Sequence, residues 1–246
     1  MKVVLIVAGS DSSGGAGLQA DIKTGEYFGV FTTTAVTALT AQNTLGVTGV
    51  VDTKPEFLKA QISAILSDFE ISAIKVGMLS NSSIIEVMRE FLSSVKVPVV
   101  LDPVFISKAG SLLMSKENIQ NLKNLFKFAT IITPNIYEAK CLFGDDLDIK
   151  ADANVVIKNI KIGEKSVDRL YYKDGKILEF KSDFLDSENL HGTGCSFSTA
   201  IASNLALGKN LEDAIKISKK YIHEAILQAP NLGHGKGPLR HNLRKI

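Results

Sequence analysis

One stretch of the chain, Asn189–Ala202, combines two glycines, a cysteine and a run of good helix formers. Gly192 and Gly194 allow the backbone to turn sharply, and the apolar spacing over 196–207 predicts a buried helix that begins at this turn. The N–H groups and the positive dipole end of a helix N-terminus attract anions, so the turn suits a phosphoryl group. Cys195 at this place is predicted to have a lowered pKa and to be a partly ionised thiolate. The alternative is a small cysteine that belongs to the core.

A second glycine-rich stretch, residues 9–17, follows the apolar run Lys2–Ala8 and precedes a helical pattern that continues to Phe28. The order is a strand buried on both faces, a loop and a helix. The loop lacks the Lys-Ser/Thr pair of a Walker A motif, and no acidic residue follows about 20 residues later, as a dinucleotide site requires. The loop is therefore either a cradle for a small ligand or a plain tight turn.

Three further candidates, Gln42, Met78 and Asp102, stand where predicted strands end. The carboxyl ends of strands in an open α/β sheet face the ligand crevice. The amide of Gln42 can pair with a heteroaromatic ring there, although a solvated loop amide is an equal alternative. Met78 fits core packing as well as ligand contact, and the carboxylate of Asp102 before a proline favours a functional role.

Two segments beyond Asp102 complete the set of candidates. Residues 107–111 combine flexible residues with the cation Lys108, as expected of a mobile flap. Asn135 and Glu138 open a predicted helix in the spacing of a capping box, which could account for both residues without any ligand.

The scaffold that holds these candidates is predicted to alternate strands and helices. Strands are expected at 2–8, 31–39, 47–52, 72–76, 97–102, 129–133, 155–160, 166–172 and 177–181, and further helices at 55–68, 81–95, 116–127, 135–143 and 211–229. This order indicates a parallel sheet covered by helices on both faces and completed by antiparallel strands. Because no linker or repeat divides the chain, we expect a single domain over residues 1–246.

Composition restricts the class of function. A net charge of +2 argues against a general attraction to nucleic acid or membranes, and no apolar run approaches the ~18 residues of a membrane span. Two cysteines leave no disulfide framework, so we expect a cytoplasmic protein that acts on small molecules. Four histidines without an HExxH or CxxC motif predict that any metal is held by oxygen ligands.

Six motifs in order resemble the hydroxymethylpyrimidine/phosphomethylpyrimidine kinases of thiamine synthesis, which belong to the ribokinase-like superfamily. The motifs lie at residues 8–24, 37–44, 75–79, 101–104, 133–138 and 191–195, so the resemblance covers nearly the whole chain. It implies a three-layer α/β/α fold with a mostly parallel sheet and antiparallel strands in the C-terminal half. It also implies a homodimeric kinase that uses ATP and Mg²⁺ to phosphorylate 4-amino-5-hydroxymethyl-2-methylpyrimidine and then its monophosphate.

The resemblance also assigns roles by position. Gly9, Asp21, Gln42 and Met78 would line the pyrimidine pocket, with Gln42 and Asp21 paired to the ring nitrogens and the amine and Met78 packed on the ring. The turn Gly192-Thr193-Gly194 would be the anion hole, and Cys195 stands where most related sugar kinases carry an Asp base. Asn135 and Glu138, with Asp102, would help hold Mg²⁺ through water, and Lys108 would supply a cation near the nucleotide.

One departure from the family concerns the nucleotide side. The helix that opens at 135 is normally followed by another helix and a strand ending in Lys-Gly-Gly-His, whereas here about a dozen residues separate Leu142 from Val155. Asn159 and Ile160 stand in place of the glycine pair. This departure leaves open a pyrimidine-binding regulatory protein without turnover. A pyridoxine or pyridoxal kinase is the other alternative, because both substrates are flat nitrogen heterocycles that bear a hydroxymethyl group.

Overall fold

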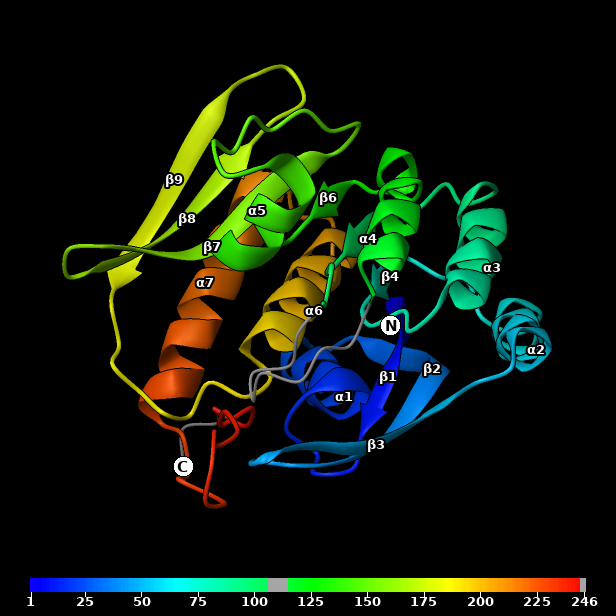
Figure 1. The fold of residues 1–246 in the computed structure, drawn as a ribbon, viewed down its shortest axis with the longest axis horizontal. Helices are drawn as coiled ribbons and strands as arrows, with labels where there is room; N and C mark the ends of the chain where they lie inside the picture. The colour runs from blue at the N-terminus through cyan, green and yellow to red at the C-terminus, as the bar shows by residue number, and fades with distance from the viewer. Residues whose placement is uncertain (106–114, 244–246) are drawn as a thin grey trace.

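The computed structural model describes residues 1–105 and 115–243, and the strands within them form one nine-stranded sheet (Figure 1). Its strand order is β3-β2-β1-β4-β5-β6-β7-β8-β9. The strands are β1 Val3–Asp11, β2 Phe31–Asn43, β3 Gly46–Asp52, β4 Ala73–Val76, β5 Val99–Leu101, β6 Ile131–Ile132, β7 Asn154–Ile162, β8 Lys165–Tyr171 and β9 Ile177–Asp183. The helices are α1 Gly17–Phe28, α2 Pro55–Leu66, α3 Ser82–Leu92, α4 Lys116–Lys123, α5 Ile136–Phe143, α6 Thr193–Ala206 and α7 Leu211–Leu227.

The direction of the strands confirms the predicted fold class. Six adjacent strands are parallel to one another, in the order β2, β1, β4, β5, β6 and β7. Strand β8 pairs antiparallel with β7, and β9 pairs antiparallel with β8. Strand β3 is also antiparallel, to β2, at the opposite edge of the sheet, a direction that the sequence analysis did not assign. The short connection between β2 and β3 requires this hairpin, because a parallel neighbour needs a crossover of a dozen or more residues.

The sheet separates two hydrophobic cores, which explains the continuous apolar run at the start of the chain. In β1, Leu5 and Val7 face a core shared with α2, α3, α4 and α5, while Val4 and Ile6 face a core shared with α1, α6 and α7. All four side chains are fully buried. A strand buried on both faces cannot alternate apolar and polar residues, so the fold is the three-layer arrangement expected.

Local capping explains where the helices differ from the predicted ranges. Helix α3 begins after Asn81, whose side chain accepts a 3.0 Å hydrogen bond from the Ile84 N–H. The predicted helix at 116–127 is divided into α4 and a 3₁₀ turn at Phe126–Phe128. None of the described helices is long and apolar enough to cross a membrane.

The connection between α5 and β7 is short, as the departure from the family predicted. Residues 144–153, all described, contain turns and extended segments and no helix. Asn159, within the bulge of β7, has a φ of 58°, a left-handed conformation that Asn tolerates better than most residues. Its N–H donates a 2.7 Å hydrogen bond to Asp168 of β8, which holds this conformation.

Candidate active site

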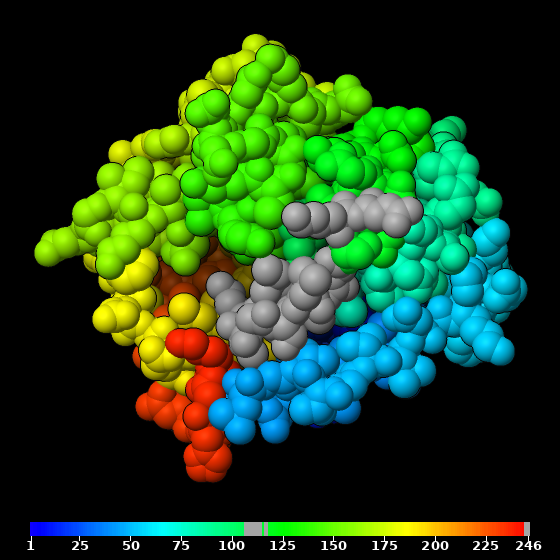
Figure 2. All heavy atoms as spheres, in the orientation of Figure 1, coloured from blue at the N-terminus to red at the C-terminus, as the bar shows by residue number. Residues whose placement is uncertain are grey.

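A pocket of about 610 Å³ opens at the carboxyl ends of β1, β4 and β5 and extends beneath α5 and β7 toward α7. Figure 2 shows this face hollowed beside the green α5 segment, with the orange atoms of α7 visible at depth. The pocket brings together ten of the candidates that the sequence singled out. They are Gly9, Gln42, Met78, Asp102, Asn135, Glu138, Gly192, Thr193, Gly194 and Cys195.

Gly9, Met78 and Gln42 form one end of the pocket, where β1, β2 and β4 end. A side chain at Gly9 would place its Cβ 3.1 Å from the Met78 sulfur, so glycine lets Met78 lie against the strand. The Met78 carbonyl accepts a 2.7 Å hydrogen bond from Thr37 Oγ1, and Gln42 Oε1 accepts one of 3.0 Å from Thr40 Oγ1. These anchors give an apolar surface and an amide with fixed positions, as a flat heterocycle requires.

The structure corrects the expected contact between Asp21 and the heterocycle. Asp21 is fully buried on α1 and does not line the pocket. Its Oδ2 lies 2.7 Å from Lys75 Nζ, and its Oδ1 accepts a 2.6 Å hydrogen bond from Thr199 Oγ1 of α6. Because a buried carboxylate needs such partners, both oxygens are turned inward, and Asp21 supports the pocket wall from behind.

Lys75, which the sequence analysis did not assign, is the side chain that Asp21 holds against the pocket. It belongs to β4, has no exposed surface and contributes to the pocket lining. Burial by itself would lower the pKa of Lys75, but Asp21 raises it above the usual value, so the ammonium form persists. A lysine inside a short, otherwise apolar strand was the available signal, because such a cation needs a buried partner.

The turn before α6, predicted to be an anion site, lines the pocket. Gly192 is the N-cap of the helix with a φ of 86°, and a Cβ there would stand 1.9 Å from the Gly15 carbonyl. Thr193 Oγ1 donates a 2.9 Å hydrogen bond to the Leu190 carbonyl. The Thr193 N–H also donates to the Leu190 carbonyl, at 3.3 Å, so the other N–H groups at the start of α6 are the ones available to an anion in the pocket.

The predicted acidity of Cys195 is wrong for this structure. Cys195 is only partly exposed, and burial raises the pKa of its thiol to about 11. Lys75 and a hydrogen bond from the Gly17 N–H favour the thiolate, while the carboxylates of Asp21 and Asp102 oppose it. The helix N-terminus alone would have acidified the thiol, but desolvation and two nearby carboxylates outweigh it.

A second buried ion pair borders the same turn. Lys158 Nζ of β7 lies 2.5 Å from Asp102 Oδ1, which also accepts a 3.1 Å hydrogen bond from Thr133 Oγ1. Burial by itself would raise the pKa of Asp102, but Lys158 and Lys75 hold it below the usual value. A Cβ at Gly194 would stand 3.1 Å from Lys158 Nζ, so this cation, also unassigned from the sequence, faces the start of α6.

Asn135 and Glu138 form the capping box that their spacing predicted. The Asn135 side chain accepts a 2.9 Å hydrogen bond from the Glu138 N–H, and Glu138 Oε2 accepts one of 2.8 Å from the Asn135 N–H. Both residues nevertheless line the pocket. Burial by itself would lower the pKa of Lys158, but the negative charges of Asp102 and, to a smaller extent, Glu138 raise it. The capping role of Asn135 and Glu138 therefore does not prevent either side chain from facing a ligand in the pocket.

Comparisons with known proteins identify the family. The family model for phosphomethylpyrimidine kinase matches residues 11–240. The chain belongs to this family. It is 40% identical to the hydroxymethylpyrimidine/phosphomethylpyrimidine kinase of Haemophilus influenzae, over 98% of this chain and 97% of the relative. It is 41% identical to the enzyme of the same name from Aquifex aeolicus, over 95% of this chain and 97% of the relative.

Solved structures of related kinases share the fold of this family member. The ADP complex of Bacillus subtilis pyridoxal kinase has a TM-score of 0.88 at 34% identity and covers 98% of this chain and 97% of its own. The phosphomethylpyrimidine kinase of Clostridium difficile has a TM-score of 0.76 at 36% identity and covers 92% of this chain and 100% of its own. Enzymes that bear these two names therefore share one scaffold.

The carboxylates of this family member suit an indirectly held magnesium ion. Asp102 Oδ1 and Glu138 Oε2 are engaged by protein donors, and among residues 1–105 and 115–243 no group of three or more His, Cys, Asp or Glu side chains could hold a metal. Mg²⁺ usually binds through one or two carboxylates, water and substrate phosphates, so the oxygens present fit that ion. Lys108 and the flap around it lie outside the described residues.

Proposed function

We propose that this chain transfers the γ-phosphoryl group of ATP to the hydroxymethyl oxygen of 4-amino-5-hydroxymethyl-2-methylpyrimidine, and then phosphorylates the resulting monophosphate. One observation carries the proposal. A single pocket is lined by Met78 and Gln42 at one end, by the start of α6 with Cys195 at its centre, and by Lys158 and Asp102 beside it. Phosphoryl transfer depends on positioning and charge neutralisation, and these are the properties of the pocket.

The heterocycle would be held by packing and by one directional pair. Met78 offers an apolar surface against the ring, and the carboxamide of Gln42 can pair with a ring nitrogen or the exocyclic amine. Lys75, fixed by Asp21, adds a permanent cation to this end of the pocket.

The transferring group would be stabilised at the start of α6. The N–H groups of Gly192 and Gly194 and the ammonium of Lys158 would offer positive charge to the phosphoryl oxygens, whereas the Thr193 N–H donates to the Leu190 carbonyl. Cys195 would accept the hydroxymethyl proton at its sulfur. Because burial raises the pKa of Cys195 to about 11, the thiolate required for this step is a minor form at neutral pH.

We further propose that Asp102, Asn135 and Glu138 hold Mg²⁺ through water, as their engaged oxygens favour. The ion would neutralise charge on the nucleotide phosphates. Lys108 stays a proposed contact to the nucleotide.

A second substrate class, pyridoxal or pyridoxine, is favoured by the likeness to pyridoxal kinases at a TM-score of 0.88. The deciding experiment is an ATP-dependent phosphorylation assay with the pyrimidine alcohol, its monophosphate, pyridoxal and pyridoxine. The pyrimidine should have the largest kcat/KM. Turnover only with the pyridine compounds would replace the proposed substrate, and binding without turnover would favour a regulatory protein.

We also propose that residues 1–246 act as one domain in a cytoplasmic homodimer. The nine described strands belong to one sheet, and both cysteines are free thiols. Apolar side chains are exposed along the β2–β3 edge, where Leu39 is 55%, Leu45 65% and Val51 68% exposed, and at the start of α2, where Phe57 is 64% exposed. Such a patch suits an interface with a second copy. Light scattering during size-exclusion chromatography measures the mass, and a monomer at high concentration would reject the dimer.

A further inference from the structure

Two hydrogen bonds from a neighbouring loop fix the backbone of Gln42. The Ser12 hydroxyl donates a 2.8 Å hydrogen bond to the Gln42 carbonyl, and its oxygen accepts one of 2.8 Å from the Gln42 N–H. On this side of β2 the ladder with β1 ends at the pair of Asp11 and Thr40, two residues earlier. A single exposed side chain, Ser12, therefore takes the place of a neighbouring strand.

Gln42 stands where β2 is least regular. The register between β2 and β3 shifts between Ala41 and Gln42, so the ladder on the other side is interrupted just before this residue. Such irregularities change the direction of a side chain and are common beside functional sites. Contacts from outside the sheet are therefore needed to fix where the Gln42 carboxamide lies.

The loop that carries Ser12 is itself held in place. Asp11 Oδ1 accepts hydrogen bonds from the Ser13 N–H at 2.8 Å and from the Ser13 hydroxyl at 2.7 Å. Asp11 Oδ2 accepts one of 2.8 Å from the Ala16 N–H and lies 2.7 Å from Nε2 of His191, in the turn before α6. Asp11 and His191 are both buried, so Ser12 projects from a well-anchored loop although its own side chain is exposed.

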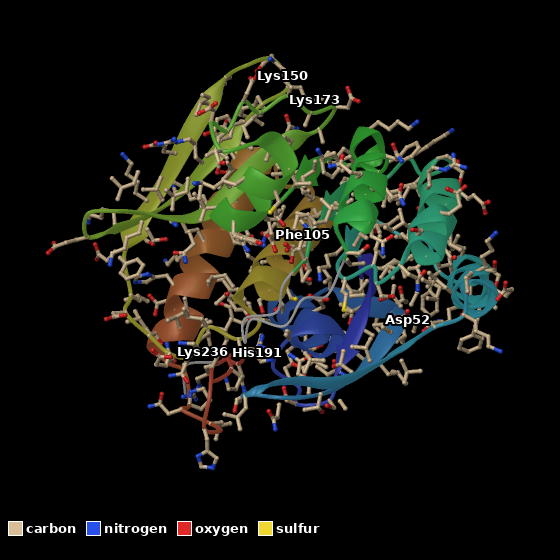
Figure 3. All side chains as sticks on the ribbon, viewed as in Figure 1. Asp52, Phe105, Lys150, Lys173, His191 and Lys236 are labelled. Atoms are coloured by element: carbon tan, nitrogen blue, oxygen red, sulfur yellow. The ribbon has the colours of Figure 1, made fainter. Side chains whose placement is uncertain are left out.

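The C-terminal segment, residues 230–241, contacts the turn between β2 and β3. The Thr44 carbonyl accepts a 3.0 Å hydrogen bond from the Lys236 N–H, and Thr44 Oγ1 accepts one of 3.2 Å from the Gly235 N–H. A Cβ at Gly235 would stand 2.2 Å from the Thr44 carbonyl oxygen, so this close approach requires glycine. Figure 1 shows the red C-terminal segment beside the tip of the β2–β3 hairpin, and Figure 3 labels its Lys236 next to His191.

The same segment continues to the turn before α6. The Gly237 carbonyl accepts a 3.0 Å hydrogen bond from the His191 N–H, and Asn189 Nδ2 donates one to Asn231 Oδ1. The segment therefore connects the end of β2, which carries Gln42, to the turn before α6, and residues of both line the pocket.

We propose that Ser12 and Gly235 are positioning residues for Gln42: they hold the end of β2 so that the carboxamide keeps one place in the pocket. Neither Ser12 nor Gly235 lines the pocket, so neither contacts the heterocycle itself. A carboxamide on a loosened strand end has to be ordered when the ligand binds, which lowers affinity. The inference rests on the proposed role of Gln42 in heterocycle binding.

The first test measures binding of the pyrimidine alcohol by isothermal titration calorimetry. Ser12→Ala should raise Kd by about three- to tenfold, as loss of a hydrogen bond does, and Ser12→Thr, which keeps the hydroxyl, should restore most of the affinity. In the Gln42→Leu background Ser12→Ala should have almost no further effect, because residues that act through one contact are not additive. Equal losses in both backgrounds would overturn the proposal.

Gly235→Ala tests the contact with the C-terminal segment. The added Cβ would meet backbone atoms of Thr44 and Leu45, which cannot rotate away as a side chain can, so the turn has to shift. Kd should again rise by about three- to tenfold in the native background and hardly at all in Gln42→Leu. A native Kd in Gly235→Ala would remove the C-terminal segment from the positioning role.

Each substitution has a matched control. Ser13→Ala removes the neighbouring hydroxyl, which bonds within its own loop to Asp11. Gly49→Ala adds a Cβ to the same hairpin, where it would lie in ordinary contact with Ala41 at 3.6 Å. Both controls should bind the pyrimidine with the native Kd. Weakening in the controls as large as in Ser12→Ala and Gly235→Ala would contradict a specific effect on Gln42.

Amide hydrogen exchange separates this inference from the proposed function. The Gln42 N–H loses its acceptor in Ser12→Ala, so peptides that cover residues 40–46 should exchange faster in Ser12→Ala and Gly235→Ala than in the two controls. If the native chain binds no heterocyclic alcohol, the proposed function fails, while the exchange rates still decide whether these residues hold the end of β2. Native exchange rates in both variants would overturn the positioning role.

Discussion

The two lysine–carboxylate pairs beside Cys195 look alike in chemistry and differ in surroundings. In the pair of Lys75 and Asp21 both side chains have no exposed surface, and Thr199 holds the remaining carboxylate oxygen. In the pair of Lys158 and Asp102 the lysine is 13% exposed and faces the start of α6. The first pair is therefore enclosed in the wall of the pocket, whereas the second keeps a partly exposed ammonium beside the pocket.

The two pairs contain the same residue types, so burial is what distinguishes a charge that stabilises the pocket wall from a charge that can contact a ligand. A buried pair gives little net stability, but removal of one partner is costly because the other charge remains without compensation. A partly exposed cation can exchange its partner for a phosphoryl oxygen with much less penalty. The predictions that follow test this distinction.

The largest effect is expected from Lys75→Met, which leaves Asp21 buried without its cation. The free energy of unfolding should fall by about 3–5 kcal/mol. Urea denaturation followed by circular dichroism measures it. The double variant Lys75→Met with Asp21→Leu removes both charges and should recover most of the loss. If the single variant is as stable as the native chain, the pair is not a supporting element.

Lys158→Met should affect turnover more than stability. Loss of a cation that stabilises the transferring group lowers kcat by about 10²–10³-fold, comparable to loss of one oxyanion-hole donor. Because Asp102 is buried, the melting temperature should also fall, but less than in Lys75→Met, since Asp102 keeps Thr133 and the nearby Lys75. Steady-state kinetics and thermal melts of the same preparation separate the two effects. A large loss of stability with native kcat would make the two pairs equivalent.

Cys195→Ala should lower kcat by about 10²-fold if the sulfur accepts the hydroxymethyl proton. The pKa of Cys195 is raised to about 11, so the thiol form dominates at neutral pH and the active thiolate becomes more abundant as pH rises. Native turnover should therefore increase from pH 7 to pH 9. Cys195→Asp, whose carboxyl group is a much stronger acid than a thiol in the same surroundings, should recover part of the activity and depend less on pH. A flat native profile would argue against a base role.

Gln42→Leu tests the end of the pocket near Lys75. Loss of the carboxamide leaves a ring nitrogen without its partner, which should weaken pyrimidine binding by about 1–3 kcal/mol. The KM and kcat for the pyrimidine measure this change, and the thermal melt serves as its control. Asp21→Ala, in contrast, should lower the melting temperature, because it leaves the buried ammonium of Lys75 without its carboxylate partner. An unchanged KM in Gln42→Leu would remove the residue from the heterocycle site.

The smallest effect is expected in the preference of the protein for one nucleoside triphosphate over another. Residues 144–153 contain no helix, so fewer groups are available to contact the base. We expect less than about tenfold difference in kcat/KM between ATP and GTP, which corresponds to under about 1.4 kcal/mol. Competition kinetics with both nucleotides provide the comparison. A strong preference for ATP would show that another segment, such as α7 or the C-terminal tail, contacts the adenine base.

The sequence by itself determined the features that depend on neighbours in the chain. The order of strands and helices, the turn at Gly192 and the capping box of Asn135 and Glu138 follow from backbone periodicity, glycine conformation and spacings of three or four residues. The motifs at the strand ends also met in one pocket, because parallel strands present their carboxyl ends at the same edge.

Only the tertiary structure decided which charges meet. Lys75 and Asp21 are 54 residues apart, and Asp11 and His191 are 180 apart, so no local pattern indicates either pair. The same holds for the pKa of Cys195. Its position at a helix N-terminus predicted an acidic thiol, but burial and the carboxylates of Asp21 and Asp102 arrive from other elements and reverse the direction. Desolvation and Coulomb interactions depend on distance in space, which the order of residues does not specify.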